Sequence, residues 1–262
     1  MATLVTFHAH PDDEAIATGG TMAKAAAEGH RVVLVLATRG ELGEAPDDLG
    51  PVGDLAARRT DETMAAAKFL GVQRVEFLGY KDSGMIGDPQ NEAPECFWKA
   101  DVEEAARSLA DILMEENADV LTVYDENGAY GHPDHIQVHR VGVRAAELAA
   151  TPAVYESTID REAFVALFER AEELGLTPPD GVGDIEGFGV PGELITTRVD
   201  VSDFLEEKRA AMAAHSSQIA ESSFFLNMGP EAFHAVWGQE TYIKRGAAPG
   251  TIDTSLFGGA GG

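Results

Sequence analysis

Short apolar runs alternate with longer amphipathic stretches through the first 158 residues of the chain. The apolar runs are rich in β-branched and aromatic side chains, which favour strands, and they lie at residues 4–7, 31–37, 75–78, 119–124 and 154–158. Stretches of helical period separate them, at residues 18–29, 55–70, 101–117 and 136–150. This alternation predicts an α/β fold, with a mostly parallel sheet, right-handed crossovers and flanking helices.

The pattern becomes less regular after residue 158. A helix is predicted at 160–174, a strand at 195–201 and a helix at 203–215, and the chain ends in a glycine-rich segment, 258–262. We therefore expect a core at 1–158 and a smaller C-terminal region at 159–262. We expect that region to complete the fold and the pocket, with a flexible tail near 258–262.

Polar clusters follow two of the predicted strands. His8-Ala9-His10-Pro11-Asp12-Asp13-Glu14 comes directly after the first strand, and His132-Pro133-Asp134-His135 comes after the fourth. Each cluster precedes a predicted helix. Because the carboxyl ends of parallel strands meet at one edge of a sheet, we expect the two clusters to converge there.

Imidazole nitrogens and carboxylate oxygens are the ligands that zinc and similar divalent ions prefer, and a catalytic site leaves one position for water. His10, Asp13 and His135 can supply three ligands. Asp12 then suits a general base, and His132 a donor to an oxyanion. Asp134 can orient a histidine from outside the ligand set.

A simpler interpretation exists for each cluster taken alone. Asp12, Asp13 and Glu14 also favour a helix N-terminus, and a His-Pro pair is common in turns. Two such clusters at one sheet edge favour a functional site. Among the other polar residues, we expect His8 and His139 to pack rather than bind, and His215 to line the pocket. The Gly19-Gly20 pair lacks the phosphate-loop spacing and indicates a close helix–sheet contact.

The composition of the chain limits the classes of partner that it can bind. The chain has 262 residues, 44% of them hydrophobic, and a net charge of −26 from 45 acidic and 19 basic side chains. Such a charge repels phosphate backbones and anionic lipid, so we expect neither nucleic acid nor a membrane as partner. With no apolar run of about 20 residues, no leader-like start and a single cysteine, Cys96, we expect a cytoplasmic protein.

Taken together, the two clusters resemble the signature of the LmbE-like, N-acetylglucosaminyl-phosphatidylinositol de-N-acetylase (PIG-L) family. The similarity extends to residues 77–85 and 214–218 and covers most of the chain. It is strongest to the actinobacterial branch that contains the mycothiol-pathway deacetylase and the mycothiol S-conjugate amidase. The segment Ala15-Ile16-Ala17 departs from both, so the resemblance implies the chemistry and leaves the substrate open.

The resemblance implies a Rossmann-like catalytic core and a metal-dependent amidohydrolase. Its substrate would be a small N-acyl amino sugar, from which water activated by one divalent ion, Zn²⁺ or alternatively Fe²⁺, removes an acetyl group from glucosamine. The matching positions are His10, Asp13 and His135 as metal ligands, Asp12 as base, His132 as electrophilic histidine, Tyr130 as a mobile tyrosine that assists carbonyl polarisation, and Arg59 and Asp82 as contacts to sugar or inositol hydroxyls.

Three alternatives stay open. The first is a hydrolase like the mycothiol S-conjugate amidase, and the second is a non-catalytic Rossmann-like protein that binds a sugar or nucleotide. The third is a non-haem iron oxygenase, which also uses two histidines and a carboxylate. The second is disfavoured because no G-x-G-x-x-G follows the first strand and a full ligand set is present. A homo-oligomer is compatible with the sequence.

Overall fold

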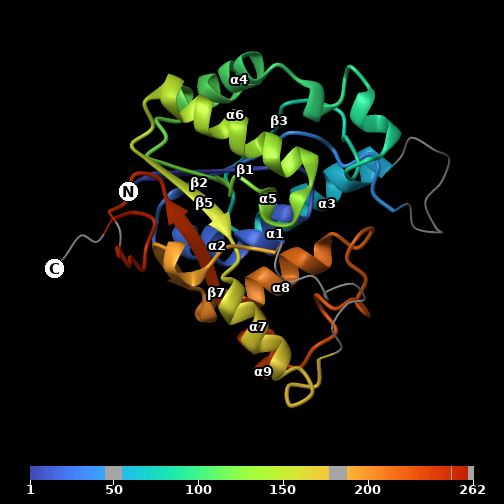
Figure 1. The fold of residues 1–262 in the computed structure, drawn as a ribbon, viewed down its shortest axis with the longest axis vertical. Helices are drawn as coiled ribbons and strands as arrows, with labels where there is room; N and C mark the ends of the chain where they lie inside the picture. Colours follow the sequence, from blue (N-terminus) through green and yellow to red (C-terminus); the bar gives the residue numbers. More distant parts are fainter. Residues whose placement is uncertain (45–54, 177–187, 249, 259–262) are drawn as a thin grey trace.

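One sheet runs through the molecule (Figure 1). The computed structural model describes residues 1–44, 55–176, 188–248 and 250–258, and within them seven strands pair in the order β3-β2-β1-β4-β5-β7-β6. The parallel strands are β1 (Thr3–His8), β2 (Arg31–Leu36), β3 (Arg74–Phe77), β4 (Val120–Tyr124) and β5 (Ala153–Thr158). They lie within one residue of their predicted positions, and their order is that of Rossmann folds.

The other two strands belong to the C-terminal region. β7 (Gln239–Lys244) pairs antiparallel with β5, and β6 (Thr197–Asp200) pairs antiparallel with β7. The prediction placed β6 correctly but missed β7, whose polar residues do not form an apolar run. The C-terminal region therefore extends the same sheet, and its separation from residues 1–158 as a distinct unit stays a prediction.

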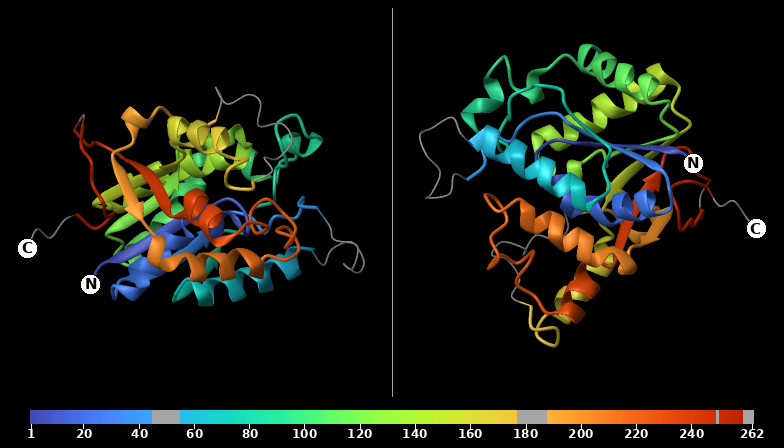
Figure 2. Two further views of the ribbon diagram at one scale, coloured as in Figure 1. Left: turned by 90° about the horizontal axis from the view of Figure 1, so that it is seen from below. Right: turned by 180° about the vertical axis from the view of Figure 1, so that it is seen from behind.

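Helices cover both faces of the sheet (Figures 1 and 2). On one face lie α4 (Val102–Glu115) and α6 (Pro133–Ala149), and on the other lie α2 (Gly19–Ala27), α3 (Leu55–Phe69) and α8 (Leu205–Ala214). The side chains of β1 alternate between the two faces of the sheet. Leu4 packs in the core on the α2 side, whereas Val5 and Phe7 pack in the core on the α4 side. The predicted α/β fold with flanking helices is confirmed.

Several element boundaries differ from the prediction. α6 begins at Pro133, earlier than expected, because proline suits the first helical position and His132 caps it. α7 (Arg161–Glu169) ends before the predicted residue 174, and the short helices α1 (Asp13–Ala17), α5 (Gly128–Gly131) and α9 (Pro230–Trp237) were not predicted. Residues 45–54, between the predicted strand at 31–37 and the predicted helix at 55–70, and residues 259–262 of the predicted tail lie outside the described residues. No helix among the described residues is long and apolar enough to span a membrane.

The Gly19-Gly20 pair brings α2 close to the chain after β6. A Cβ atom on Gly20 would lie 2.6 Å from the Cβ of Val201, whereas one on Gly19 would meet its neighbours only at 3.5 Å. The expected requirement for glycine is therefore confirmed at Gly20, and the partner is Val201.

We predict that Gly20→Ala lowers the free energy of unfolding by about 1–3 kcal/mol, because the added methyl group overpacks a filled contact. The neighbouring Gly19→Ala is the matched control. It has room for the methyl group, and alanine favours the helix, so its stability should be unchanged or slightly higher. Urea unfolding of both variants measures the difference, and equal midpoints would contradict the prediction.

Candidate active site

A pocket of about 210 Å³ opens at the carboxyl edge of the parallel strands, where the predicted clusters converge. Its wall comes from the loops after β1, β2, β3 and β4 and from α3; it consists of His10, Asp12, Asp13, Leu42, Gly43, Arg59, Asp82, Gly84, Met85, Tyr130 and His132. The two remaining predicted residues, Asp134 and His135, are buried beside it. A larger hollow, of about 560 Å³, lies away from these residues, around Asp160 and Glu193.

Three of the predicted residues form a compact donor set. Asp13 Oδ2 lies 3.3 Å from His10 Nδ1 and 3.3 Å from His135 Nε2. Both ring nitrogens of His135 are buried without a hydrogen-bond partner among the described residues. The carboxylate of Asp13 therefore lies between two imidazoles, and one of these, His135, has ring nitrogens without a hydrogen-bond partner among the described residues. Such a donor set fits a divalent ion. His10, His132 and His135 also place nitrogens within 4.8 Å of one another.

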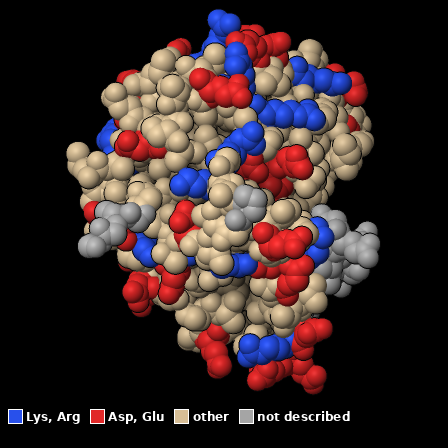
Figure 3. Space-filling view, turned by 60° about the vertical axis from the view of Figure 1, so that its left-hand side comes forward, with Lys and Arg blue, Asp and Glu red and all other residues tan. Residues whose placement is uncertain are grey.

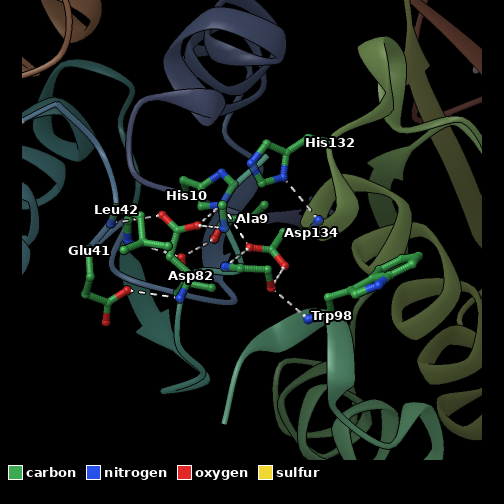
Figure 4. A network of polar contacts seen from close by, with 12 residues as sticks. Ala9, His10, Glu41, Leu42, Asp82, Trp98, His132 and Asp134 are labelled. Carbon is green, nitrogen blue, oxygen red and sulfur yellow. Dashed lines mark hydrogen bonds and ion pairs between the residues drawn. The ribbon is translucent and has the colours of Figure 1, made fainter. Parts of the chain in front are cut away.

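Asp134 holds the opposite side of His10 (Figure 4). Its Oδ2 lies 3.1 Å from His10 Nε2 and accepts a 3.0 Å hydrogen bond from the backbone N–H of Ser83. The Ser83 hydroxyl donates to the other oxygen of Asp134 and accepts from the backbone N–H of Trp98. This carboxylate therefore fixes the orientation of His10 and leaves Nδ1 turned toward Asp13. Ser83 and Trp98 were not predicted as parts of the site.

His132 is held in a defined tautomer. Its Nδ1 accepts a 3.1 Å hydrogen bond from the backbone N–H of Asp134, which caps α6. Burial, together with the charges of His10 and His135, lowers the pKa of His132 to about 4. The ring is therefore neutral near pH 7, and its hydrogen sits on Nε2, where it can donate to a ligand in the pocket.

Asp12 occupies an unusual backbone position at the start of α1. Its φ of 94° lies in a region that non-glycine residues rarely adopt. Burial raises the pKa of the Asp12 carboxyl to about 7, and the charge of Arg59, whose Nη2 lies 3.3 Å from Oδ2, opposes part of that rise. A carboxyl with this pKa can both accept and return a proton near neutral pH.

Arg59 and Asp82 join the loops that form the pocket wall. Arg59 donates to the backbone oxygens of Gly40 at 2.7 Å and Pro11 at 2.5 Å. Asp82 accepts from the backbone N–H groups of Gly84 at 2.9 Å and Leu42 at 3.3 Å. Burial alone would raise the pKa of Asp82, but contact with His10 and the backbone donors lowers it well below its usual range. Both side chains are thus held in defined positions in the wall.

Tyr130 lies at the pocket mouth on the short helix α5, whose backbone is kinked. Its side chain is 48% exposed, and its ring centre lies 5.0 Å from that of His135. The preceding residue, Ala129, has a φ of 64°. Asp125 holds this conformation by accepting from the backbone N–H groups of Asn127 and Ala129. Sequence reasoning missed Asp125, although an aspartate three positions before a glycine, here Gly128, is a common turn signal.

The remaining predicted histidines have structural contacts. His8 bonds to the hydroxyls of Tyr124 and Thr18, both at 2.9 Å, and His139 Nδ1 lies 3.0 Å from the backbone oxygen of Tyr124. Both therefore pack, as expected. The expectation for His215 is wrong, because its side chain is fully buried behind the pocket and does not line it. Tyr124, which was not predicted, stacks on the ring of His135 at 4.1 Å.

Several known proteins are similar to this chain in sequence or in fold. Residues 5–146 match the family model PIG-L, described as GlcNAc-PI de-N-acetylase. A 1D-myo-inositol 2-acetamido-2-deoxy-alpha-D-glucopyranoside deacetylase of Nocardiopsis dassonvillei is 47% identical, over 96% of this chain and 99% of the relative. One of Thermomonospora curvata is 45% identical, over 87% and 86%. The N,N'-diacetylchitobiose deacetylase from Pyrococcus horikoshii shares the fold, with a TM-score of 0.61 at 22% identity and coverage of 95% and 84%.

Proposed function

Because the chain belongs to the PIG-L family, we propose that it is a metal-dependent deacetylase that removes the N-acetyl group from a small glucosamine-type substrate. The observation that carries this proposal is the meeting of Asp12, His132 and the donor set of His10, Asp13 and His135 at one pocket. The names of the relatives make a 1D-myo-inositol-linked N-acetylglucosaminide the first substrate to test.

The donor set would hold the metal through His10 Nδ1, Asp13 Oδ2 and His135 Nε2. Its mixture of imidazole and carboxylate suits Zn²⁺, with Fe²⁺ as the alternative. Bound there, a divalent ion would supply Lewis acidity to the amide carbonyl and acidify water. Asp134 and Ser83 would keep the His10 ring in the orientation that the donor set requires.

The residues around the donor set have complementary roles in the proposed reaction. The Asp12 carboxylate takes the proton of the attacking water and, with its raised pKa, can return it to the leaving amine. The neutral His132 donates from Nε2 to the carbonyl oxygen as negative charge develops there, and Tyr130 assists from the pocket mouth. Arg59 and Asp82 contact the sugar or inositol hydroxyls.

The charge distribution favours a small neutral substrate over a polyanion. On the face shown in Figure 3, acidic and basic side chains are interspersed, and the chain as a whole carries a net charge of −26. The expected absence of nucleic-acid and membrane partners, the cytoplasmic location and a homo-oligomer stay predictions.

An amine-release assay tests the proposed function. We expect turnover of the inositol-linked N-acetylglucosaminide, loss of turnover after treatment with a chelator, and recovery when Zn²⁺ or Fe²⁺ is added back. The metal that restores the higher rate at matched occupancy identifies the cofactor. N,N'-diacetylchitobiose and a cysteine-derived thiol conjugate serve as comparison substrates.

Each alternative gives a different result in the same assay. Hydrolysis of the thiol conjugate alone would indicate an amidase of the S-conjugate type. Binding of the sugar without amine release would indicate a non-catalytic protein. Activity that is indifferent to the chelator would contradict the metal assignment.

A further inference from the structure

A buried ion pair lies directly behind the pocket. Glu14, in the first turn of α1, and His215, at the end of α8, are both fully buried. His215 Nε2 lies 2.6 Å from Glu14 Oε1, although the two residues are 201 positions apart. Neither side chain belongs to the pocket wall, and neither has a role in the proposed chemistry.

The second oxygen of Glu14 reaches the backbone of Asp12. Glu14 Oε2 accepts a 3.0 Å hydrogen bond from the Asp12 N–H. Asp12 needs such support, because its φ of 94° is strained for a non-glycine residue and persists only where surrounding contacts enforce it. Arg59 restrains the other end of the same residue, at the carboxylate. Glu14 therefore restrains the backbone of Asp12 on the buried side, and Arg59 restrains its carboxylate.

The contact with His215 accounts for how a third carboxyl group can be buried beside Asp12 and Asp13. Burial alone disfavours the imidazolium form, but the neighbouring charge of Glu14, reinforced by those of Asp12 and Glu62, raises the pKa of His215 above its ordinary value. His215 Nε2 occupies Glu14 Oε1 at 2.6 Å, so Glu14 Oε2 stays directed at the Asp12 N–H.

We propose that Glu14 and His215 are positioning residues that fix the backbone of Asp12 so that its carboxylate faces the reacting groups. The inference rests on the proposed function, because it concerns Asp12 as the base. It also gives the C-terminal region a part in catalysis, since α8 supports the base although the described pocket wall comes entirely from residues 10–132.

Two replacements of Glu14 separate positioning from charge. Glu14→Gln keeps an oxygen that accepts from the Asp12 N–H, so we expect kcat close to that of the wild type. Glu14→Leu has similar size but no acceptor, so we expect kcat to fall about 100-fold, the usual effect of misplacing a reacting group by about 1 Å. KM and metal content should stay unchanged, because Arg59, Asp82 and the metal-ligand set are intact.

His215→Gln is a second, milder variant. It should also lower kcat, by a smaller factor than Glu14→Leu does. Gly20→Ala serves as a stability control, because it destabilises the α2 contact without touching Asp12. If positioning is the cause, Gly20→Ala keeps its kcat and Glu14→Leu loses it. Wild-type kcat in Glu14→Leu, a parallel loss in Gly20→Ala, or loss of metal from Glu14→Leu would overturn the proposal.

Hydrogen exchange at the Asp12 N–H gives a readout that does not depend on turnover. We expect slow exchange in the wild type and in Glu14→Gln, and fast exchange in Glu14→Leu. If the wild type releases amine from no N-acetyl amino sugar, the proposed function fails, yet this exchange pattern still tests the positioning contact. Equal exchange in all three proteins would overturn the contact itself.

Discussion

Replacing Asp12 with asparagine should lower kcat by about 10³-fold while the protein keeps its metal, because general acid–base catalysis contributes on this scale. Asparagine has nearly the same shape as aspartate and tolerates a positive φ, so the backbone at 94° should not rearrange. The amide lacks a basic carboxylate and cannot take a proton from water. Asp12→Ala should also abolish turnover, with added strain at the same backbone position.

Metal analysis and steady-state kinetics of the same samples check this prediction. His10, Asp13 and His135 remain in Asp12→Asn, so metal content should equal that of the wild type. KM should change little if Arg59 and Asp82 hold the substrate. Wild-type rates in either variant would exclude Asp12 as the base, and loss of metal would mean that Asp12 acts through the ligand set.

Removing the positive charge of Lys208 should lower the free energy of unfolding more than Gly20→Ala does. Lys208 lies on α8 and is buried; its Nζ lies 2.5 Å from Glu240 Oε1 and donates to the backbone oxygen of Ile16 at 2.8 Å. Glu240, on β7, also accepts from the N–H groups of Gly20 and Thr21 at the start of α2. Lys208→Met leaves this carboxylate without its cation, and losing one partner of a buried pair costs about 3–5 kcal/mol.

A double-mutant cycle checks this interpretation. Lys208→Met combined with Glu240→Gln removes both charges, and the amide oxygen can still accept from the α2 N-terminus. We therefore expect the double variant to be more stable than the sum of the two single changes predicts, in urea unfolding. Additive losses would show that the pair is not coupled and that each residue contributes only through packing.

Two kinds of information in this chain are local, and both could be predicted. The parallel strands β1, β2 and β4 follow from apolar runs rich in β-branched residues, because burial on both faces imposes that composition. β3 and β5 include charged residues and follow from their β-branched and aromatic side chains. The donor set could also be predicted, because His10 and Asp13 share one turn and His135 stands in a second cluster with the same placement after a strand. The roles assigned to these residues stay predictions until the variants are measured.

The remaining contacts of the site and of the sheet join residues that are far apart in the sequence, so no local sequence pattern predicts them. β7 was missed because its Glu240 reads as an exposed polar residue, and only the positions of Lys208 and the α2 N-terminus make it a buried one. Ser83 lies in the loop after β3, and only the position of Asp134 on α6 makes its N–H and hydroxyl parts of the site.

The sequence by itself determined the α/β architecture and which side chains could bind a metal, because both follow from local composition and spacing. Only the tertiary structure decided how the base is held. Glu14 and His215 are 201 positions apart, and no periodicity links them. Their pairing results from α8 packing beside α1, and that packing depends on the whole core rather than on either segment.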